Sequence, residues 1–295
     1  MNRWVGVGFI FLSAVCFGAM PLFANVAYAS GISPSALLFL RFGIASMFLW
    51  GVLLIRHSRF QRLSCPPLKT IFSLCLMGAL GYAGLAFSYF TALQYAPAGL
   101  VAVLLYLYPA LVTAISALVS KQAISRLKWL ALMVSLLGIV LIIGIPSGGR
   151  LIGILLGIAA AVIYALYILV GERVTKGMDV WLSSTIIISS AALVYGVNGW
   201  LHGIQWPQTS QAWWAAGALA IVSTVVAIGA FFEGVQRIGA VDASMLSTIE
   251  PVASVLLAWG ILGERLTVWG LIGGAMILLA AILLARNEPL AEPTT

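Results

Sequence analysis

Charged side chains are scarce in this sequence. Asp, Glu, Lys and Arg make up 8% of its 295 residues, and 62% of the residues are hydrophobic. An ordinary soluble domain carries roughly a quarter charged residues and has too little interior to bury so much apolar surface. The composition therefore excludes a soluble binding module and indicates a membrane protein.

Side chains that catalyse reactions or bind metals are also few, with eight acids, two histidines and three cysteines. His57 and His202 lie far apart in predicted loops, and Cys16, Cys65 and Cys75 lack the spacing of metal ligands. The sequence has no glycine-rich loop followed by Lys and Ser or Thr, which weighs against ATP hydrolysis within the chain. We therefore expect no catalytic residue, no metal and no cofactor, and a membrane-embedded enzyme is a weak alternative.

Long apolar runs dominate the chain, and ten of them have the length of about 20 residues that spans a bilayer as a helix. Barrel strands are half as long and alternate in polarity, so these runs predict helices. The expected fold class is an all-α integral membrane protein with ten transmembrane helices. The predicted spans are Trp4 to Ala24, Ser35 to Ile55, Thr70 to Leu93, Ala98 to Val119, Trp129 to Ile145, Leu151 to Val170, Trp181 to Trp200, Trp213 to Phe232, Ala243 to Leu262 and Val268 to Ala285.

The basic residues are distributed unequally between the two sides of the membrane that these spans define. Arg150 and Arg265 fall on the predicted outer side and Arg41 falls inside a span, while the rest of the fifteen Lys and Arg lie on the opposite side. By the positive-inside rule both termini are expected in the cytoplasm, with the protein in the inner cell membrane. The net charge of +7 is then a topological signal. We expect a small-molecule substrate and membrane lipid as partners and no nucleic acid, and a monomer is compatible with the sequence.

An internal repeat divides the chain. A shift of 142 positions aligns Phe90, Gln94, Ala98 and Pro109 with Phe232, Gln236, Ala240 and Pro251. Residues 1–146 and 150–286 then hold five spans each, and 287–295 form a cytoplasmic tail. Because five is odd, the second repeat must enter the membrane in the opposite orientation. Inverted repeats around a central cavity are typical of secondary transporters that work by alternating access.

Several motifs resemble the drug/metabolite transporter superfamily, and within it the EamA-type exporters, over nearly the whole chain. Two of these motifs and a glycine pair lie in the second half: Thr248-Ile249-Glu250-Pro251-Val252, Leu262-Gly263-Glu264-Arg265-Leu266-Thr267, and Gly273 with Gly274. Three lie in the first half: Leu38-Phe39-Leu40-Arg41-Phe42, Ala92-Leu93-Gln94-Tyr95-Ala96-Pro97-Ala98, and Tyr108-Pro109. One departure is Ser120-Lys121-Gln122, where an acidic residue is usual in the family.

The resemblance implies export of small organic metabolites. Among family members the chain is most similar to the YddG-type exporters of aromatic amino acids, which implies amino acids, including aromatic ones, as substrates. Export of cationic drugs or other metabolites is the alternative. A membrane channel is the weaker one, because the chain shows no ring of like charges and no repeated carbonyl-rich loops.

Two ionisable residues lie within predicted spans, where insertion costs about 2.5 to 3.5 kcal/mol. Arg41 has the planar fork that binds a substrate carboxylate, although hydrogen bonds to loop carbonyls or snorkelling to the outer interface would also explain it. Glu250 is suited to a substrate ammonium or a coupling proton, or to satisfying backbone groups left open by Pro251. The two residues are expected at different depths, without a direct salt bridge.

Three prolines are expected to bend or break spans. Pro21 interrupts the first span, and Pro109 and Pro251 occupy equivalent places in the two repeats. Each of the latter two removes a helical hydrogen bond, which frees the carbonyl groups of Leu105 and Ser247.

Tyrosines near mid-span are the expected partners of an aromatic substrate, because the tryptophans fall at span ends as interfacial anchors. Tyr108, which aligns with Glu250, is preferred, together with Tyr82 and Tyr164. The other candidates near mid-span are Tyr89, Tyr106 and Tyr167. Tyr106 is expected on a different helix face from Tyr108. Close helix packing is expected at the small residues Gly78, Gly81, Gly84, Gly153 and Gly157.

Overall fold

The computed structural model describes residues 3–59, 66–120, 124–144, 149–204, 206–263 and 266–286. Throughout these ranges the regular structure is helical, without a strand. The helices of the first half are α1 (Arg3–Gly18), α2 (Met20–Ala29), α3 (Pro34–Arg59), α4 (Leu68–Leu76), η1 (Met77–Tyr82), α5 (Ala83–Ala92), α6 (Ala98–Leu105), α7 (Tyr108–Ser120) and α8 (Arg126–Ile143). Those of the second half are α9 (Leu151–Val174), α10 (Val180–His202), α11 (Ser210–Ala220), η2 (Ile221–Val226), α12 (Ala227–Leu246), η3 (Ser247–Ile249), α13 (Glu250–Leu257), η4 (Ala258–Leu262) and α14 (Val268–Arg286).

Nine stretches within the described residues are long and apolar enough to cross a membrane. The all-α membrane class is thus confirmed, but the ten expected spans are not matched one for one. The eighth and ninth expected spans fall in a single stretch, Ser210–Ile261, of 52 residues. A straight helix of that length would measure about 78 Å, more than twice the hydrocarbon core. Inside this stretch Gly239 leaves helical geometry, with φ 81° and ψ 162°.

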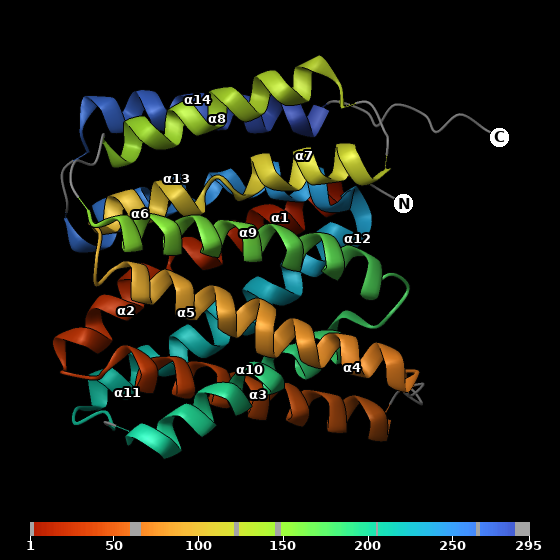
Figure 1. The fold of residues 1–295 in the computed structure, drawn as a ribbon, viewed down its shortest axis with the longest axis vertical. Coiled ribbons are helices and arrows are strands. Elements are labelled where there is room, and N and C mark those ends of the chain that lie inside the picture. Colours follow the sequence, from red (N-terminus) through yellow and green to blue (C-terminus); the bar gives the residue numbers. More distant parts are fainter. Residues whose placement is uncertain are drawn as a thin grey trace.

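The helices lie roughly parallel, and the start of α1 and the end of α14 lie at the same end of the bundle (Figure 1). Helices from the two halves pack against each other: α8 against α14, α1 against α12, α3 against α10 and α5 against α9. Glycines permit the closest of these contacts. A Cβ at Gly138 of α8 would lie 2.6 Å from the carbonyl oxygen of Gly273 on α14, so this crossing requires small residues.

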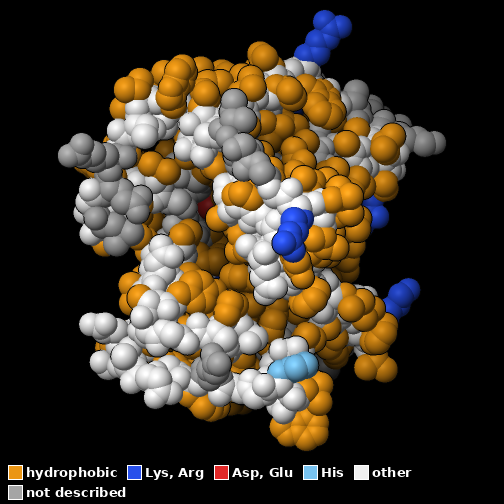
Figure 2. Space-filling model, turned by 60° about the vertical axis from the view of Figure 1, so that its left-hand side comes forward, with side chains coloured by type: hydrophobic (Ala, Val, Ile, Leu, Met, Phe, Trp, Pro, Cys, Tyr) orange, Lys and Arg blue, Asp and Glu red, His pale blue; other side chains and the backbone are white. Residues whose placement is uncertain are grey.

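Polar side chains cap the helices where the chain turns between spans. The Asp179 Oδ1 atom accepts a hydrogen bond of 3.0 Å from the Leu182 N–H at the start of α10, and Ser125 and Thr209 cap α8 and α11 in the same way. These bonds satisfy N–H groups that have no partner within the helix. Large apolar side chains such as Leu54, Leu193 and Leu271 are exposed on the exterior, as expected of a surface in contact with lipid. Hydrophobic atoms cover much of the surface in Figure 2.

Several sequence predictions lie outside the described residues. They concern Cys65, Lys121 with Gln122, Glu264 with Arg265, the joint 146–148 and the tail 287–295. Cys16 and Cys75 carry free thiols. Exposed tryptophans include Trp4, Trp50, Trp200, Trp214 and Trp269, which suits the predicted anchoring role.

Candidate functional site

A cavity of about 320 Å³ lies between the two halves of the chain. All five predicted substrate-binding residues line it: Arg41, Tyr82, Tyr108, Tyr164 and Glu250. Figure 2 brings forward the side of the bundle opposite the start of α1 and the end of α14, and the surface there is hollowed, with acidic side-chain atoms visible inside. The structure therefore brings together residues that lie up to 209 positions apart, between Arg41 and Glu250.

Glu250 is the first residue of α13, directly after the short 3₁₀ turn η3. Its carboxylate makes no hydrogen bond or ion pair with another described residue, and of the described residues that line the cavity it alone is acidic. The expected absence of a salt bridge to Arg41 agrees with the geometry. An unpaired carboxylate in an apolar cavity is costly unless a cation or a proton joins it. Glu250 is therefore free to take a positively charged ligand.

Arg41 differs from Glu250 because its side chain is already engaged. It is 5% exposed, and each of its three guanidinium nitrogens contacts a protein acceptor. Nη2 donates to the Tyr82 hydroxyl and to the Ser223 carbonyl, both at 2.9 Å. Neither alternative foreseen from the sequence matches these surroundings, because the carbonyl of Ser223 belongs to the helical segment η2 rather than to a loop, and the buried side chain does not reach the surface. A substrate carboxylate would have to displace some of these partners.

The tyrosines form a continuous aromatic wall. The ring centroids of Tyr108 and Tyr164 are 4.4 Å apart, and those of Tyr82 and Tyr167 are 5.7 Å apart with an interplanar angle of 21°. Tyr164 and Tyr167 join the two pairs at 6.3 Å. Such spacings are those of favourable ring contacts. Tyr82, Tyr108 and Tyr164 line the cavity, where aromatic rings can hold an aromatic or cationic ligand, whereas Tyr167 does not.

The prediction that Tyr106 and Tyr108 face different ways was wrong. Both line the cavity, with ring centroids 6.4 Å apart. The argument assumed a continuous helix, but α6 ends at Leu105 and α7 begins at Tyr108, so the chain turns between the two rings. Tyr89, a further mid-span candidate, also lines the cavity, whereas sequence reasoning left out three phenylalanines of the lining: Phe17, Phe42 and Phe90.

Helical geometry is interrupted beside each of the three prolines. α1 ends at Gly18 before Pro21, α6 gives way to α7 before Pro109, and η3 separates α12 from α13 before Pro251. The expected free carbonyl of Ser247 is satisfied, because it accepts a hydrogen bond from the Glu250 N–H. Pro21 and Pro251 line the cavity, whereas Pro109 does not. The breaks place side chains from several helix ends around one space.

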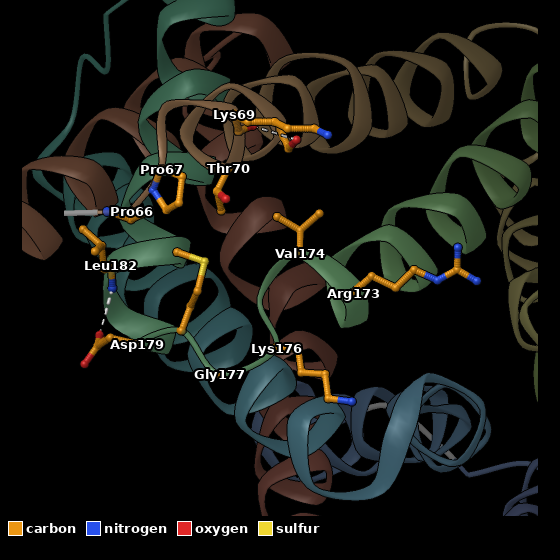
Figure 3. Close-up of a pocket in the computed structure, with 12 residues that line it drawn as sticks. Pro66, Pro67, Lys69, Thr70, Arg173, Val174, Lys176, Gly177, Asp179 and Leu182 are labelled. Carbon is orange, nitrogen blue, oxygen red and sulfur yellow. Dashed lines mark hydrogen bonds between the residues drawn. The ribbon is translucent and has the colours of Figure 1, made fainter. Parts of the chain in front are cut away.

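A second, larger cavity of about 510 Å³ lies where α4 begins and where α9 turns into α10. Figure 3 shows the side chains of Arg173 and Lys176 extending away from Pro67 and Thr70, and Asp179 bonded to Leu182 at the start of α10. Arg173 and Lys176 are among the basic residues whose positions predict the orientation of the protein in the membrane. None of the predicted substrate-binding residues lies here, so the cavity around Glu250 is the candidate site.

Comparisons with known proteins agree with this architecture. The model of the EamA-like transporter family matches the chain twice, at residues 4–144 and 151–286. A protein of Archaeoglobus fulgidus named as an uncharacterized transporter is 31% identical over 230 residues, covering 75% of this chain and 78% of its own. The uncharacterized inner membrane transporter YedA of Escherichia coli K12 is 25% identical and covers 84% of this chain and 80% of its own.

A solved crystal structure shares the fold. It superposes with a TM-score of 0.83 at 23% identity and covers 97% of this chain and 100% of that one. The family and the named relatives identify a multi-pass membrane transporter rather than an enzyme. The two matches together span almost the whole described chain, so the protein belongs to the EamA-like transporter family.

Proposed function

We propose that the protein is a secondary transporter that exports small organic molecules, amino acids including aromatic ones among them, by alternating access. The observation that carries the proposal is the cavity between the two halves, in which one unpaired carboxylate, Glu250, faces a wall of tyrosines. Glu250 accepts the substrate ammonium group, and Tyr82, Tyr108 and Tyr164 hold its apolar or aromatic body. Export as the direction rests on the resemblance to exporters, since alternating access is itself reversible.

Ten membrane crossings and inverted repeats belong to the same proposal. The Ser210–Ile261 stretch crosses twice, folding back at Gly239, whose conformation is one that glycine alone adopts readily. Each half then has five crossings, with both termini in the cytoplasm. Arg3 supports a common side for the termini, because its Nη2 donates to the carbonyl of Leu284, near the end of α14, at 2.8 Å.

Helix packing supports the repeat with matched contacts. A Cβ at Gly6 on α1 would meet Ile238 and Arg237, and one at Gly153 on α9 would meet Ala96 and Tyr95. Ile238 and Arg237 lie 142 positions after Ala96 and Tyr95, the same offset that aligns the two halves. The first helix of each half thus packs on equivalent residues of the other half, as a pseudo-twofold axis requires.

Cationic drugs and amines are the second candidate substrates, and one observation favours them. The cavity offers a free carboxylate, whereas the guanidinium of Arg41 is occupied by protein acceptors. A ligand with an ammonium group and no carboxylate would satisfy Glu250 without disturbing Arg41.

The test is uptake of labelled phenylalanine into liposomes with and without the purified protein. We expect saturable uptake that unlabelled aromatic amino acids inhibit. Phenethylamine, which lacks the carboxylate, measures the second candidate in the same assay. Uptake of both compounds equal to that of protein-free liposomes would contradict the proposal.

A further inference from the structure

The third apolar stretch of each half contains a π-helical segment. A further π-helical segment, η4 (Ala258–Leu262), lies at the end of the stretch Ser210–Ile261. The other two are η1, Met77–Tyr82, in Leu68–Ala92, and η2, Ile221–Val226, in the corresponding part of the second half. Their first residues are 144 positions apart, close to the repeat offset of 142. π-Helical turns are rare and are found mostly at functional sites. Their occurrence at equivalent places in both halves calls for a common role.

Arg41 bridges these two segments. Its Nη2 donates to the hydroxyl of Tyr82, the last residue of η1, at 2.9 Å, while Nε donates to Thr224 Oγ1 in η2 at 2.6 Å. Nη2 also donates to the carbonyl of Ser223 in η2 at 2.9 Å. Arg41, Ser223 and Thr224 are all at least nine-tenths buried, at 5%, 0% and 0% exposure. One side chain of α3 thus holds a helix from each half.

The π geometry explains why η2 can accept these bonds. An extra residue in the turn displaces N–H groups from their usual carbonyl partners, which then need other donors. Thr224 Oγ1 donates to the carbonyl of Leu219, five residues earlier, at 2.9 Å and accepts from Arg41 at the same time. A hydroxyl has one donor and two acceptor sites, so both bonds can form together.

The bonds of Arg41 leave little capacity for a substrate. A guanidinium has five N–H groups. Nε uses one on Thr224, Nη2 uses both on Tyr82 and Ser223, and Nη1 contacts the sulfur of Met20 at 3.4 Å. Bidentate binding of a carboxylate would therefore require breaking existing bonds. Tyr82 lines the cavity, however, so a ligand that contacts its ring reaches η2 through Arg41.

We propose that Arg41 is a positioning residue for transport: it couples η1 to η2 across the repeats, and this coupling governs the rate of the conformational step rather than the affinity for substrate. The inference rests on the proposed transport function. Substrate contact at Tyr82 is passed through Arg41 to Ser223 and Thr224, and so to the helix of the opposite half.

Thr224→Val tests this coupling at a residue that does not line the cavity. It keeps the shape of the side chain and removes the acceptor of Arg41, whereas Thr224→Ser restores a hydroxyl. We expect Thr224→Val to lower the maximal uptake rate about tenfold, with KM within about twofold of the unchanged protein, and Thr224→Ser to recover most of the rate. Thr185→Val, another buried threonine whose hydroxyl bonds only its own helix, is the matched control with an unchanged rate.

Two results in this assay would overturn the proposal. One is a normal maximal rate for Thr224→Val. The other is a rise in KM for phenylalanine but not for phenethylamine in that variant, because it would assign Arg41 to the substrate carboxylate.

A second measurement does not depend on transport. Tyr82→Phe removes the hydroxyl on η1, and hydrogen exchange is then measured at the amides of η2, in the opposite half. We expect faster exchange in Ile221–Val226, and unchanged exchange there would refute the coupling. If the unchanged protein shows no saturable uptake, the proposed function fails, while this exchange experiment still decides for or against the role of Arg41.

Discussion

Arg3 and Asp242 lie 239 positions apart in the sequence, yet Arg3 Nη1 is 2.9 Å from Asp242 Oδ2. Lys128 also forms an ion pair with Asp242. Arg3 begins α1, Lys128 lies in the first turn of α8, and Asp242 is in α12. Arg3 further donates to carbonyls at the end of α14. The buried carboxylate of Asp242 therefore joins α1, α8 and α12, and Arg3 extends the contact to α14, at the end of the bundle where α1 begins and α14 ends.

Asp242→Asn should destabilise the protein. The Asp242 side chain is 4% exposed, and its removal as an anion leaves two partly buried cations without their partner. Breaking a fully buried pair costs about 3 to 5 kcal/mol, and the 17% and 18% exposure of Arg3 and Lys128 reduces our expectation to about 1 to 3 kcal/mol. The measurement is the apparent melting temperature in detergent.

Glu233→Gln is the matched control for this change. Glu233 pairs with Arg237 one helical turn away, and the two side chains are 28% and 26% exposed. An exposed pair of this kind contributes less than about 1 kcal/mol. Equal melting temperatures for the two variants would argue against a structural role for Asp242.

Gly78→Ala should disrupt the contact between η1 and α10. A Cβ at Gly78 would collide with the carbonyl oxygen of Ile187 and lie 2.8 Å from the Cβ of Ser190. The backbone of α10 would have to move, at a cost of about 1 to 3 kcal/mol. Gly51→Ala, where a new Cβ meets nothing within 4 Å, is expected to be neutral or slightly stabilising. Thermal unfolding of both variants in detergent tests the difference, and comparable losses of stability would count against tight packing at Gly78.

The membrane spans could be predicted because their signal is local. The length of an apolar run can be read directly from the sequence. The helices from α1 to α10 and α14 therefore fall close to the expected spans. The cavity residues Glu250 and Tyr108 could also be found, since a charge in a span and a proline-associated tyrosine stand out in an apolar sequence. In contrast, a π turn adds one residue to a helix that is apolar on all sides, which leaves no mark on the pattern.

The partners of Arg41 and Asp242 could not be predicted for a different reason. Tyr82, Ser223 and Thr224 lie 41, 182 and 183 positions from Arg41, so only the assembled bundle brings them together. Arg3 and Lys128 were interpreted as orientation signals alone. An orientation signal says nothing about which side chains a basic residue contacts, so the ion pairs of Arg3 and Lys128 with Asp242 were not expected. The signal that could have pointed to Asp242 is its place near a span end in a chain with only eight acids.

Gly239→Ala should destabilise the non-helical conformation at Gly239, where we propose that Ser210–Ile261 folds back. The φ of 81° and ψ of 162° at Gly239 lie in a region that is essentially restricted to glycine, so the variant is expected to lose about 1 to 3 kcal/mol. The next amide, Ala240 N–H, donates to Glu172 Oε1 at 2.9 Å, which fixes the turn against α9. The matched control is Gly229→Ala, in the same helix, where a new Cβ meets nothing within 4 Å. A melting temperature for Gly239→Ala as high as that of the control would mean that this turn tolerates a side chain.

Glu250→Gln should weaken recognition of the ammonium group while leaving the cavity intact. Glutamine has nearly the same shape as glutamate, and the Glu250 carboxylate has no described protein partner to lose, so the fold is expected to be retained. The variant loses the charge-assisted hydrogen bond between the substrate ammonium group and the carboxylate. We therefore expect KM to rise about tenfold or more for both phenylalanine and phenethylamine. Competition by phenylpropionate, which carries no ammonium group, should not change. Glu233→Gln makes the same substitution outside the cavity and should transport normally.

If Glu250 also exchanges substrate for a proton, the dependence of the uptake rate on pH disappears in Glu250→Gln. An unchanged KM for both amines would remove Glu250 from the binding site, whatever the pH profile shows.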